Sequence, residues 1–191
     1  MVIIIGITGA TGAIYGIRLL EVLSSMKDVE THLVISKAGE TTIRYETQWK
    51  IENIKKMASY NYDIEDICAR ISSGSFQRDG MIIAPCTIKT MSALANSFCD
   101  NLIIRAGDVT LKERKKLVLL VRETPLHLGH IRNMERLTEM SAIIMPPVPA
   151  FYHKPRTIQD IVDQTVGMAL DLFGIKHNLF KRWTGLAPEK D

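Results

Sequence analysis

The sequence predicts a three-layer α/β fold, in which a parallel β-sheet is covered by helices on both faces. Short runs of Val, Ile and Leu alternate with segments of helical periodicity along most of the 191 residues. These runs are continuous and do not alternate with polar residues, which is typical of strands buried on both faces. The length and the 46% hydrophobic content fit a single domain spanning residues 1–191.

The predicted strands are apolar runs bounded by glycine, proline or polar residues. In chain order they are Val2–Ile5, Thr31–Ile35, Met81–Ala84, Leu117–Val121 and Ala142–Met145. Prolines 146, 147 and 149 end the last of them. The alternation of these strands with helices is what favours a parallel sheet.

The predicted helices follow the strands and show apolar residues three or four positions apart. They are a helix that ends near Lys27, one opened by Gly39 and Glu40 and reaching Glu46, one through Met91–Ala95, one through Ile131–Leu137, and a last one from Thr157 to Phe173. Residues 112–116 are expected on a solvated helix end. Residues 47–80 are irregular, with short elements only, and a tail of little periodicity starts at about Gly174.

A glycine-rich loop follows the first strand and precedes the first helix. Gly6, Gly9 and Gly12 can bring backbone N–H groups and a helix N-terminus to one spot, which favours binding of a phosphate. Their spacing differs from the dinucleotide fingerprint, and Ser36-Lys37 stands where an NAD-binding protein has an acid. These observations argue against NAD. A turn that only lets the helix pack on its strand is the alternative interpretation.

Residues that follow the strands should converge, because the carboxyl ends of parallel strands meet at one edge of a sheet. They are Thr8–Gly12, Ser36–Lys37, Pro85–Thr90, Arg122–Glu123 and Pro146–Tyr152. The set is rich in hydroxyls and cations and contains one carboxylate. It favours a phosphorylated ligand with a carboxylic acid close to it.

Composition disfavours several other classes of function. The net charge of +3 is spread over interleaved acids and bases, so nucleic-acid binding is not expected. The three cysteines have no CxxC spacing, which indicates neither a zinc site nor a disulfide framework. No apolar run reaches the roughly 18 residues of a membrane span, and we expect a soluble cytoplasmic protein without a metal. Cys86 is expected to pack in the core, and His127 and His130 to have structural or capping roles.

Several blocks of sequence together resemble the UbiX-type flavin prenyltransferases. They are GITGATGAIYGIRLLE, VISKA, PCTIKTMS, NLIIRAGDVTLKERKKLVLLVRETP and PPVPAFYHKP, and the resemblance runs from Ile3 to about Trp183. It implies a Rossmann-like (flavodoxin-like) domain that binds FMN and joins a dimethylallyl group from dimethylallyl monophosphate to N5 and C6 of the reduced flavin. It also implies a dodecamer with active sites shared between subunits, and a UbiD-type decarboxylase that receives the prenylated FMN.

The resemblance also implies roles for individual residues. For the flavin these are Gly9, Ala10, Thr11, Ser36, Arg122 and the loop Thr87, Ile88, Lys89 and Thr90. For the donor phosphate they are Arg105, Lys112, Arg122 and Tyr152, with Trp183 near the prenyl group. Glu123 is the acid that assists departure of phosphate, and Glu46 and Thr11 belong to a proton path.

The chain departs from the family pattern at two positions. Thr11 replaces a serine, and Met168 stands where the family commonly has Arg or Lys on the phosphate, which leaves the identity of the donor open. Two alternative functions are an FMN-dependent cysteine decarboxylase and a non-catalytic flavin-binding subunit of a decarboxylase complex. A cysteine decarboxylase is expected to have a catalytic His after the first helix region and a PASANT-like loop. It is disfavoured because no His precedes Thr31 and residues 85–90 read PCTIKT.

Overall fold

The computed structural model describes residues 1–185, which form two compact units. The first runs from Met1 to Pro147 and the second begins at Val148. The expectation of a single domain stays a prediction. Among the described residues, no helix is long and apolar enough to cross a membrane.

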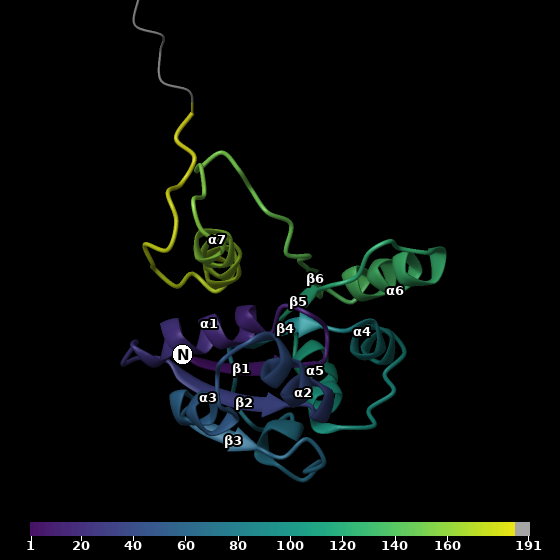
Figure 1. Cartoon of the computed structure of the whole chain (residues 1–191). Helices are drawn as coiled ribbons and strands as arrows, with labels where there is room; N and C mark the ends of the chain where they lie inside the picture. The colour runs from purple at the N-terminus through teal and green to yellow at the C-terminus, as the bar shows by residue number, and fades with distance from the viewer. Residues whose placement is uncertain (186–191) are drawn as a thin grey trace, which may run out of the picture. The chain divides into compact units, whose positions relative to one another are not determined.

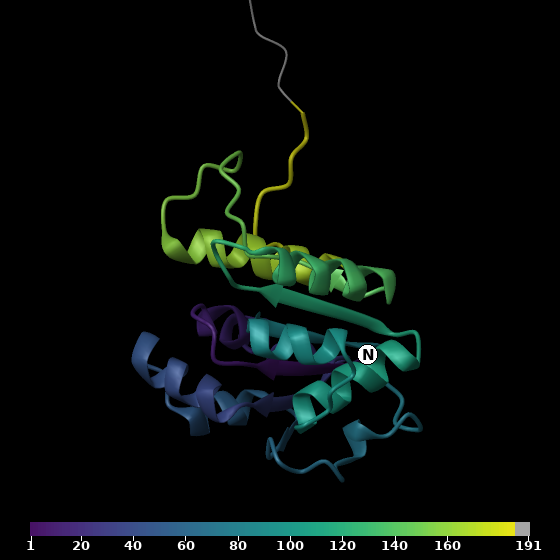
Figure 2. The same ribbon diagram turned by 90° about the vertical axis from the view of Figure 1, so that its right-hand side faces the viewer.

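The first unit is built on a six-stranded sheet with the order β3-β2-β1-β4-β5-β6. The strands are β1 (Val2–Ile7), β2 (Glu30–Ile35), β3 (Tyr60–Tyr62), β4 (Gly80–Cys86), β5 (Lys116–Val121) and β6 (Ile143–Ile144). Every pair is parallel, and the arrows of β1 and β5 point the same way in Figure 2. The chain order reverses between β1 and β4, so a ligand site is expected where these two strands end.

The helices of the first unit cover both faces of this sheet (Figure 1). They are α1 (Ala13–Ser24), α2 (Lys37–Glu46), α3 (Ile51–Met57), α4 (Ile88–Ala95), α5 (Leu102–Lys112) and α6 (Leu128–Glu139), with a short 3₁₀ turn η1 (Arg70–Ser72). Helix α1 contacts β1, β2 and β4 and has α2 and α3 beside it, whereas α5 contacts β2, β4 and β5 and has α4 and η1 beside it.

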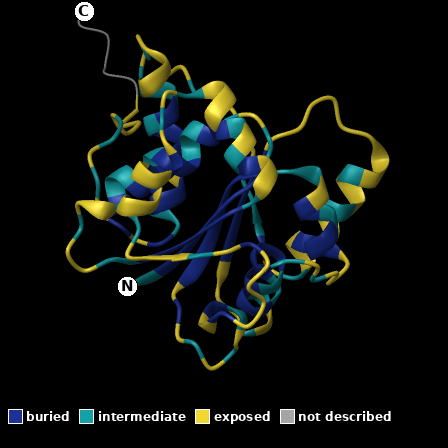
Figure 3. Ribbon diagram, turned by 60° about the horizontal axis from the view of Figure 1, so that its bottom comes forward, coloured by how far each residue is buried: buried dark blue, intermediate teal, exposed yellow. Residues whose placement is uncertain are grey.

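Alternate side chains of the strands enter opposite layers of the core. Ile4, Met81 and Leu117 pack in one apolar cluster with Ile104 of α5 and Leu137 of α6. The central strands are buried along almost their whole length, as the dark blue ribbons of Figure 3 show. The continuous apolar runs of the sequence therefore correspond to strands that are covered on both faces.

The second unit contains one helix, α7 (Ile158–Asp171), among its described residues. Thr157 caps it, because its hydroxyl accepts the N–H of Asp160 while the Asp160 carboxylate accepts the N–H of Thr157. The remaining described residues, 148–157 and 172–185, form turns and extended segments.

The sequence prediction was correct for the five strands in type and order, and it missed β3. The first helix ends at Ser24, three residues before the predicted end near Lys27. The apolar run Leu102–Ile104 and the charged Lys112 belong to one helix, α5, of which the sequence indicated only the end.

Candidate functional site

A cavity of about 520 Å³ lies at the carboxyl ends of β1, β2 and β4. It is lined by residues from each strand end and from the segments before α4 and α5: Thr8, Gly9, Ser36, Lys37, Ala38, Ile64, Glu65, Thr87, Lys89, Thr90, Asp100, Asn101 and Ile103. Three of the five strand ends that the sequence predicted to converge therefore meet here. The cavity occupies the place where the strand order reverses, as expected for an open parallel sheet.

Three helices begin at this cavity, and each begins with a polar cap. Ser36 Oγ accepts the N–H of Gly39 at the start of α2, and Thr87 Oγ1 accepts the N–H of Thr90 at the start of α4. Asn101 Oδ1 accepts the N–H of Ile104 at the start of α5. The positive ends of three helix dipoles therefore face one space, which favours an anionic ligand group.

Thr8 links the ends of the two central strands. Its hydroxyl donates to the carbonyl of Pro85 at 2.7 Å and accepts the N–H of Thr87 at 2.9 Å. Thr8 is 2% exposed, so this link lies in the floor of the site. Because both hydrogen bonds are made by one buried hydroxyl, the loop that caps α4 is fixed relative to β1.

Gly9 is required for the close approach of the glycine loop to α2. A Cβ atom at this position would lie 2.5 Å from the Cβ of Ala38. The hydroxyl of Thr42 also donates to the Gly9 carbonyl, at 3.1 Å. The glycine therefore serves packing of the loop on α2 as well as lining the cavity, and a larger residue would displace α2.

Two ion pairs lie at the rim of the cavity. Lys37 Nζ is 2.9 Å from Glu65 Oε1, and Lys89 Nζ is 3.2 Å from Asp100 Oδ2. Contact with Glu65 raises the pKa of Lys37 above its ordinary value. Each pair has one lysine at a helix N-terminus and one acid on a neighbouring loop, so an anion that binds either lysine must compete with the paired acid.

The N-terminus of the first helix is capped by a carboxylate from α2. Glu46 Oε2, from the end of α2, accepts the N–H groups of Gly12 at 2.9 Å and Ala13 at 3.2 Å. Gly12 has no side chain with which to cap the helix, and the carboxylate takes that role. A carboxylate therefore already takes the N–H groups at the start of α1, whereas the N-termini of α2, α4 and α5 face the cavity, and the expectation of a phosphate at the glycine loop stays a prediction.

Of the residues predicted to contact the flavin, five line the cavity: Gly9, Ser36, Thr87, Lys89 and Thr90. Ala10, Thr11, Ile88 and Arg122 do not line it. Thr11 lies next to Gly12, whose N–H binds Glu46, so the structure brings the predicted proton-path pair close in space.

Arg122 and Glu123 lie at the carboxyl end of β5, beside the strand that leads into the cavity. The N–H of Arg122 donates to the carbonyl of Cys86 at 3.2 Å, immediately before Thr87. Both side chains are exposed, and Glu123 Oε1 accepts the N–H of Thr124 at 3.2 Å. Glu123, the predicted acid, therefore lies at the end of β5, which is the neighbour of β4, and Thr87, which follows β4 directly, lines the cavity.

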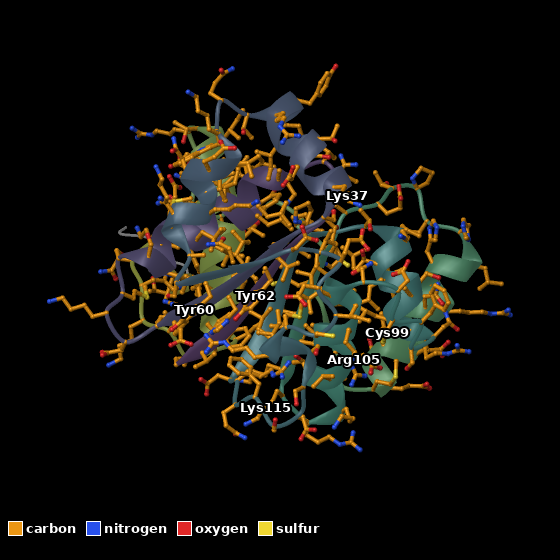
Figure 4. The ribbon with its side chains drawn as sticks, turned by 90° about the horizontal axis from the view of Figure 1, so that it is seen from below. Lys37, Tyr60, Tyr62, Cys99, Arg105 and Lys115 are labelled. Carbon is orange, nitrogen blue, oxygen red and sulfur yellow. The ribbon has the colours of Figure 1, made fainter. Side chains whose placement is uncertain are left out.

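Arg105 and Lys112 do not reach the cavity of their own chain. Helix α5 begins at the cavity, and Lys112 is its last residue, about 15 Å along the helix at 1.5 Å per residue. Arg105 Nε donates to the carbonyl of Ser72, and its guanidinium is 3.4 Å from Asp108. Figure 4 shows Lys37, at the cavity, separated from Arg105 and from Lys115, which follows α5.

The predicted donor-binding residues of the second unit are Tyr152, Met168 and Trp183, and all three are exposed. The rings of Tyr152 and Trp183 form an edge-to-face pair with centroids 5.8 Å apart. Met168 lies on α7 and is 45% exposed, so it is not a core residue, and the amide of Gln164 donates to its sulfur.

The structure confirms three predictions of a structural or surface position for residues that were not assigned to the site. Cys86 is fully buried, and burial raises the pKa of its thiol far above the ordinary value, so it packs in the core. His127 caps α6, because its Nδ1 accepts the N–H of Gly129 at 3.0 Å. Residues 114–116 are exposed.

No group of three His, Cys, Asp or Glu side chains within residues 1–185 could hold a metal ion.

Six residues that line the cavity were missed: Ala38, Ile64, Glu65, Asp100, Asn101 and Ile103. An available signal was Asn101, since an Asn before an apolar run is typical of a helix N-cap. The segment around Ile64 gave no local signal, because its place is fixed by β3 and by a hydrogen bond from the Leu102 N–H to the Ile64 carbonyl.

The cavity fits a flavin mononucleotide. The hydroxyls of Ser36, Thr87 and Thr90, the helix N-termini and two lysines suit its phosphate, whereas Ile64 and Ile103 supply apolar surface for a ring. The parallel sheet, its strand order and this cavity together define a Rossmann-like protein that binds a phosphorylated ligand.

Comparison with known proteins places the chain within this class. Residues 1–170 match the family model described as Flavoprotein. A flavin prenyltransferase UbiX of Thauera aromatica is 57% identical over 185 residues, which are 97% of this chain and 95% of the relative. The chain belongs to the flavoprotein family and, within it, to the UbiX-type flavin prenyltransferases.

Two solved structures have nearly the same fold. One is a crystal structure of AnUbiX in complex with FMN and dimethylallyl pyrophosphate, with a TM-score of 0.95, 50% identity, and coverage of 97% of this chain and 98% of that one. The other is a dodecameric FMN-dependent UbiX-like decarboxylase from Escherichia coli O157:H7, with a TM-score of 0.95, 46% identity, and coverage of 97% and 100%. They confirm the α/β fold predicted from the sequence.

Proposed function

We propose that this chain joins a dimethylallyl group from dimethylallyl monophosphate to N5 and C6 of reduced FMN. Membership of the flavin prenyltransferases supports the reaction class. The observation that carries the proposal is the meeting of three capped helix N-termini at one cavity, which suits the flavin phosphate. When bound, the reduced flavin supplies the atoms that are alkylated.

In the proposed reaction, the residues of this chain bind two phosphates and assist the departure of one. The hydroxyls of Ser36 and Thr87 hold the flavin phosphate, and Arg122 lies between that site and the donor. Glu123 gives a proton to the phosphate oxygen that leaves the allylic carbon. Cations around the leaving group and aromatic faces near the prenyl group stabilise the charges that develop as the bond breaks.

Arg105 and Lys112 serve the donor phosphate of a neighbouring subunit in this proposal. Their position on α5, away from the cavity of their own chain, supports such sharing. A solved relative is dodecameric, which supports an oligomer of the same kind here. A mixture of two impaired variants, Lys112→Ala and Glu123→Gln, then regains activity when subunits are exchanged, and failure to regain it contradicts a shared site.

Glu46 and Thr11 form the proton path. The carboxylate of Glu46 lies against the N-terminus of α1 beside Thr11, so it is held in place by two backbone N–H groups. We further propose that the protein works in the cytoplasm and delivers its product to a UbiD-type decarboxylase.

One assay tests the proposed activity. The protein is mixed anaerobically with reduced FMN and dimethylallyl monophosphate, or with the pyrophosphate in a parallel sample, and the flavin is analysed by mass spectrometry. A flavin heavier by one prenyl unit is expected with the monophosphate. Unchanged flavin in both samples overturns the proposal, and decarboxylation of a peptidyl cysteine by the same preparation favours the cysteine decarboxylase alternative.

A further inference from the structure

The described end of the chain folds back along α7 and is held there by one carboxylate. After α7, the N–H of Ile175 donates to the carbonyl of Leu170, and the chain reverses direction. Asp171, the last residue of α7, then contacts two residues of the returning segment. Its oxygens accept two hydrogen bonds from the guanidinium of Arg182, at 2.8 and 2.6 Å, and one from His177 at 3.2 Å.

The returning segment is seated closely on the helix. The imidazole of His177 is 3% exposed, and its Nδ1 accepts the N–H of Leu179, so Nε2 carries the hydrogen that is donated to Asp171 and to the carbonyl of Gly167. Gly167 makes room for this ring and for Phe180, since a Cβ there would lie 2.6 Å from both. The packing fixes residues 177–180, and the bidentate pair with Asp171 fixes Arg182.

Trp183 follows Arg182 directly, and its indole ring forms an edge-to-face pair with the ring of Tyr152. Trp183 is 58% exposed and lies on an extended segment, so little packing holds it in place. The guanidinium of Arg182 also lies 5.3 Å from the ring of Phe180. The link from Asp171 through Arg182 is therefore the strongest contact that determines where the indole lies.

We infer that Asp171 is a positioning residue, which holds Trp183 against Tyr152 through its bidentate pair with Arg182. The inference rests on the proposed function for its catalytic consequence, because the two aromatic rings are the residues proposed to face the donor. Asp171 itself acts through Arg182. The nearby cation lowers the pKa of the Asp171 carboxyl, so the pair stays ionised near neutral pH.

The test uses the full-length protein in a Trp49→Phe background, where Trp183 is the only tryptophan. Asp171→Asn and Arg182→Ala each remove the pair, Arg182→Lys keeps the charge, and Lys181→Ala removes a neighbouring exposed cation as a control. Acrylamide quenching of Trp183 fluorescence is measured at equal flavin occupancy. The quenching constant is expected to rise toward that of free tryptophan in Asp171→Asn and Arg182→Ala, and to stay unchanged in Lys181→Ala.

Kinetics with dimethylallyl monophosphate supply the second readout. The KM for the donor is expected to rise roughly three- to tenfold in Asp171→Asn and Arg182→Ala, with partial recovery in Arg182→Lys and no change in the Kd of FMN. Wild-type KM should also rise with ionic strength, and that dependence should be weaker in Asp171→Asn.

Unchanged quenching in both Asp171→Asn and Arg182→Ala overturns the inference. If Asp171→Asn fails to fold, the exposed Arg182→Ala variant decides, because its side chain is 55% exposed. If the wild-type protein transfers no prenyl group, the proposed function fails, and the quenching measurement still decides whether Asp171 positions Trp183.

Discussion

Removal of the Thr87 hydroxyl should weaken flavin binding far more than it weakens the fold. This hydroxyl accepts the N–H of Thr90 at 3.2 Å and donates to the Thr90 hydroxyl at 3.0 Å, at the helix end that faces the cavity. The isosteric change Thr87→Val removes one helix cap, which costs about 1 kcal/mol of stability. When FMN is bound, we expect this hydroxyl to donate to the phosphate in place of the Thr90 hydroxyl, and a hydrogen bond to a charged group contributes about 1.5 to 3 kcal/mol.

The loss of that donor corresponds to an increase of roughly 10- to 150-fold in the Kd of FMN. The Kd is measured by titration of flavin fluorescence, and stability by thermal unfolding. Thr157→Val is the matched control, because Thr157 caps α7 through the same kind of hydrogen bond and does not line the cavity. A Kd within twofold of wild type in Thr87→Val, with stability reduced as in the control, would show that Thr87 is only a helix cap.

Three further predictions concern catalysis, the donor and acid stability. Glu123→Gln should leave the Kd of FMN unchanged and slow prenyl transfer by roughly two to four orders of magnitude in single-turnover experiments, since an amide cannot give a proton to phosphate. A wild-type rate in this variant excludes Glu123 as the acid. Met168→Arg should lower the KM for dimethylallyl monophosphate by roughly tenfold without loss of folding, because Met168 is exposed and the proposed donor site gains a cation; an unchanged KM contradicts this. Burial lowers the pKa of His32 from its ordinary value of 6.5. The contribution of neutral His32 to stability is therefore complete above pH 6.5 and is lost as the pH falls through the lowered pKa. In His32→Phe the acid unfolding midpoint should move to lower pH, and an unchanged midpoint contradicts this prediction.

The sheet was predictable because the signal for a buried strand is local. Each long strand contains a continuous apolar run of at least three residues, and the parallel arrangement places the ends of these runs at one edge. The convergence of Ser36 and Thr87 followed from that rule alone. β3 has only three residues, Tyr60–Tyr62, and a polar residue at its centre, so it lacked the pattern that identified the others.

The contacts that complete the site depend on packing between distant segments and could not be predicted. Glu46 caps α1 from 34 residues away in sequence, because α2 packs beside α1. The ion pair of Lys37 with Glu65 depends on the path of an irregular segment after β3. The resemblance gave Arg105 and Lys112 a role at a phosphate, but the direction of α5, which takes them away from the cavity of their own chain, appears only in three dimensions.

An experimental structure of the protein soaked with FMN tests the central claim most directly. We expect the phosphate of FMN at the N-termini of α2 and α4, within hydrogen-bond distance of Ser36 and Thr87, with Glu46 still bound to the N–H of Gly12. A phosphate bound at the N-terminus of α1 in place of Glu46, or a flavin outside the cavity lined by Ser36 and Thr87, would contradict it.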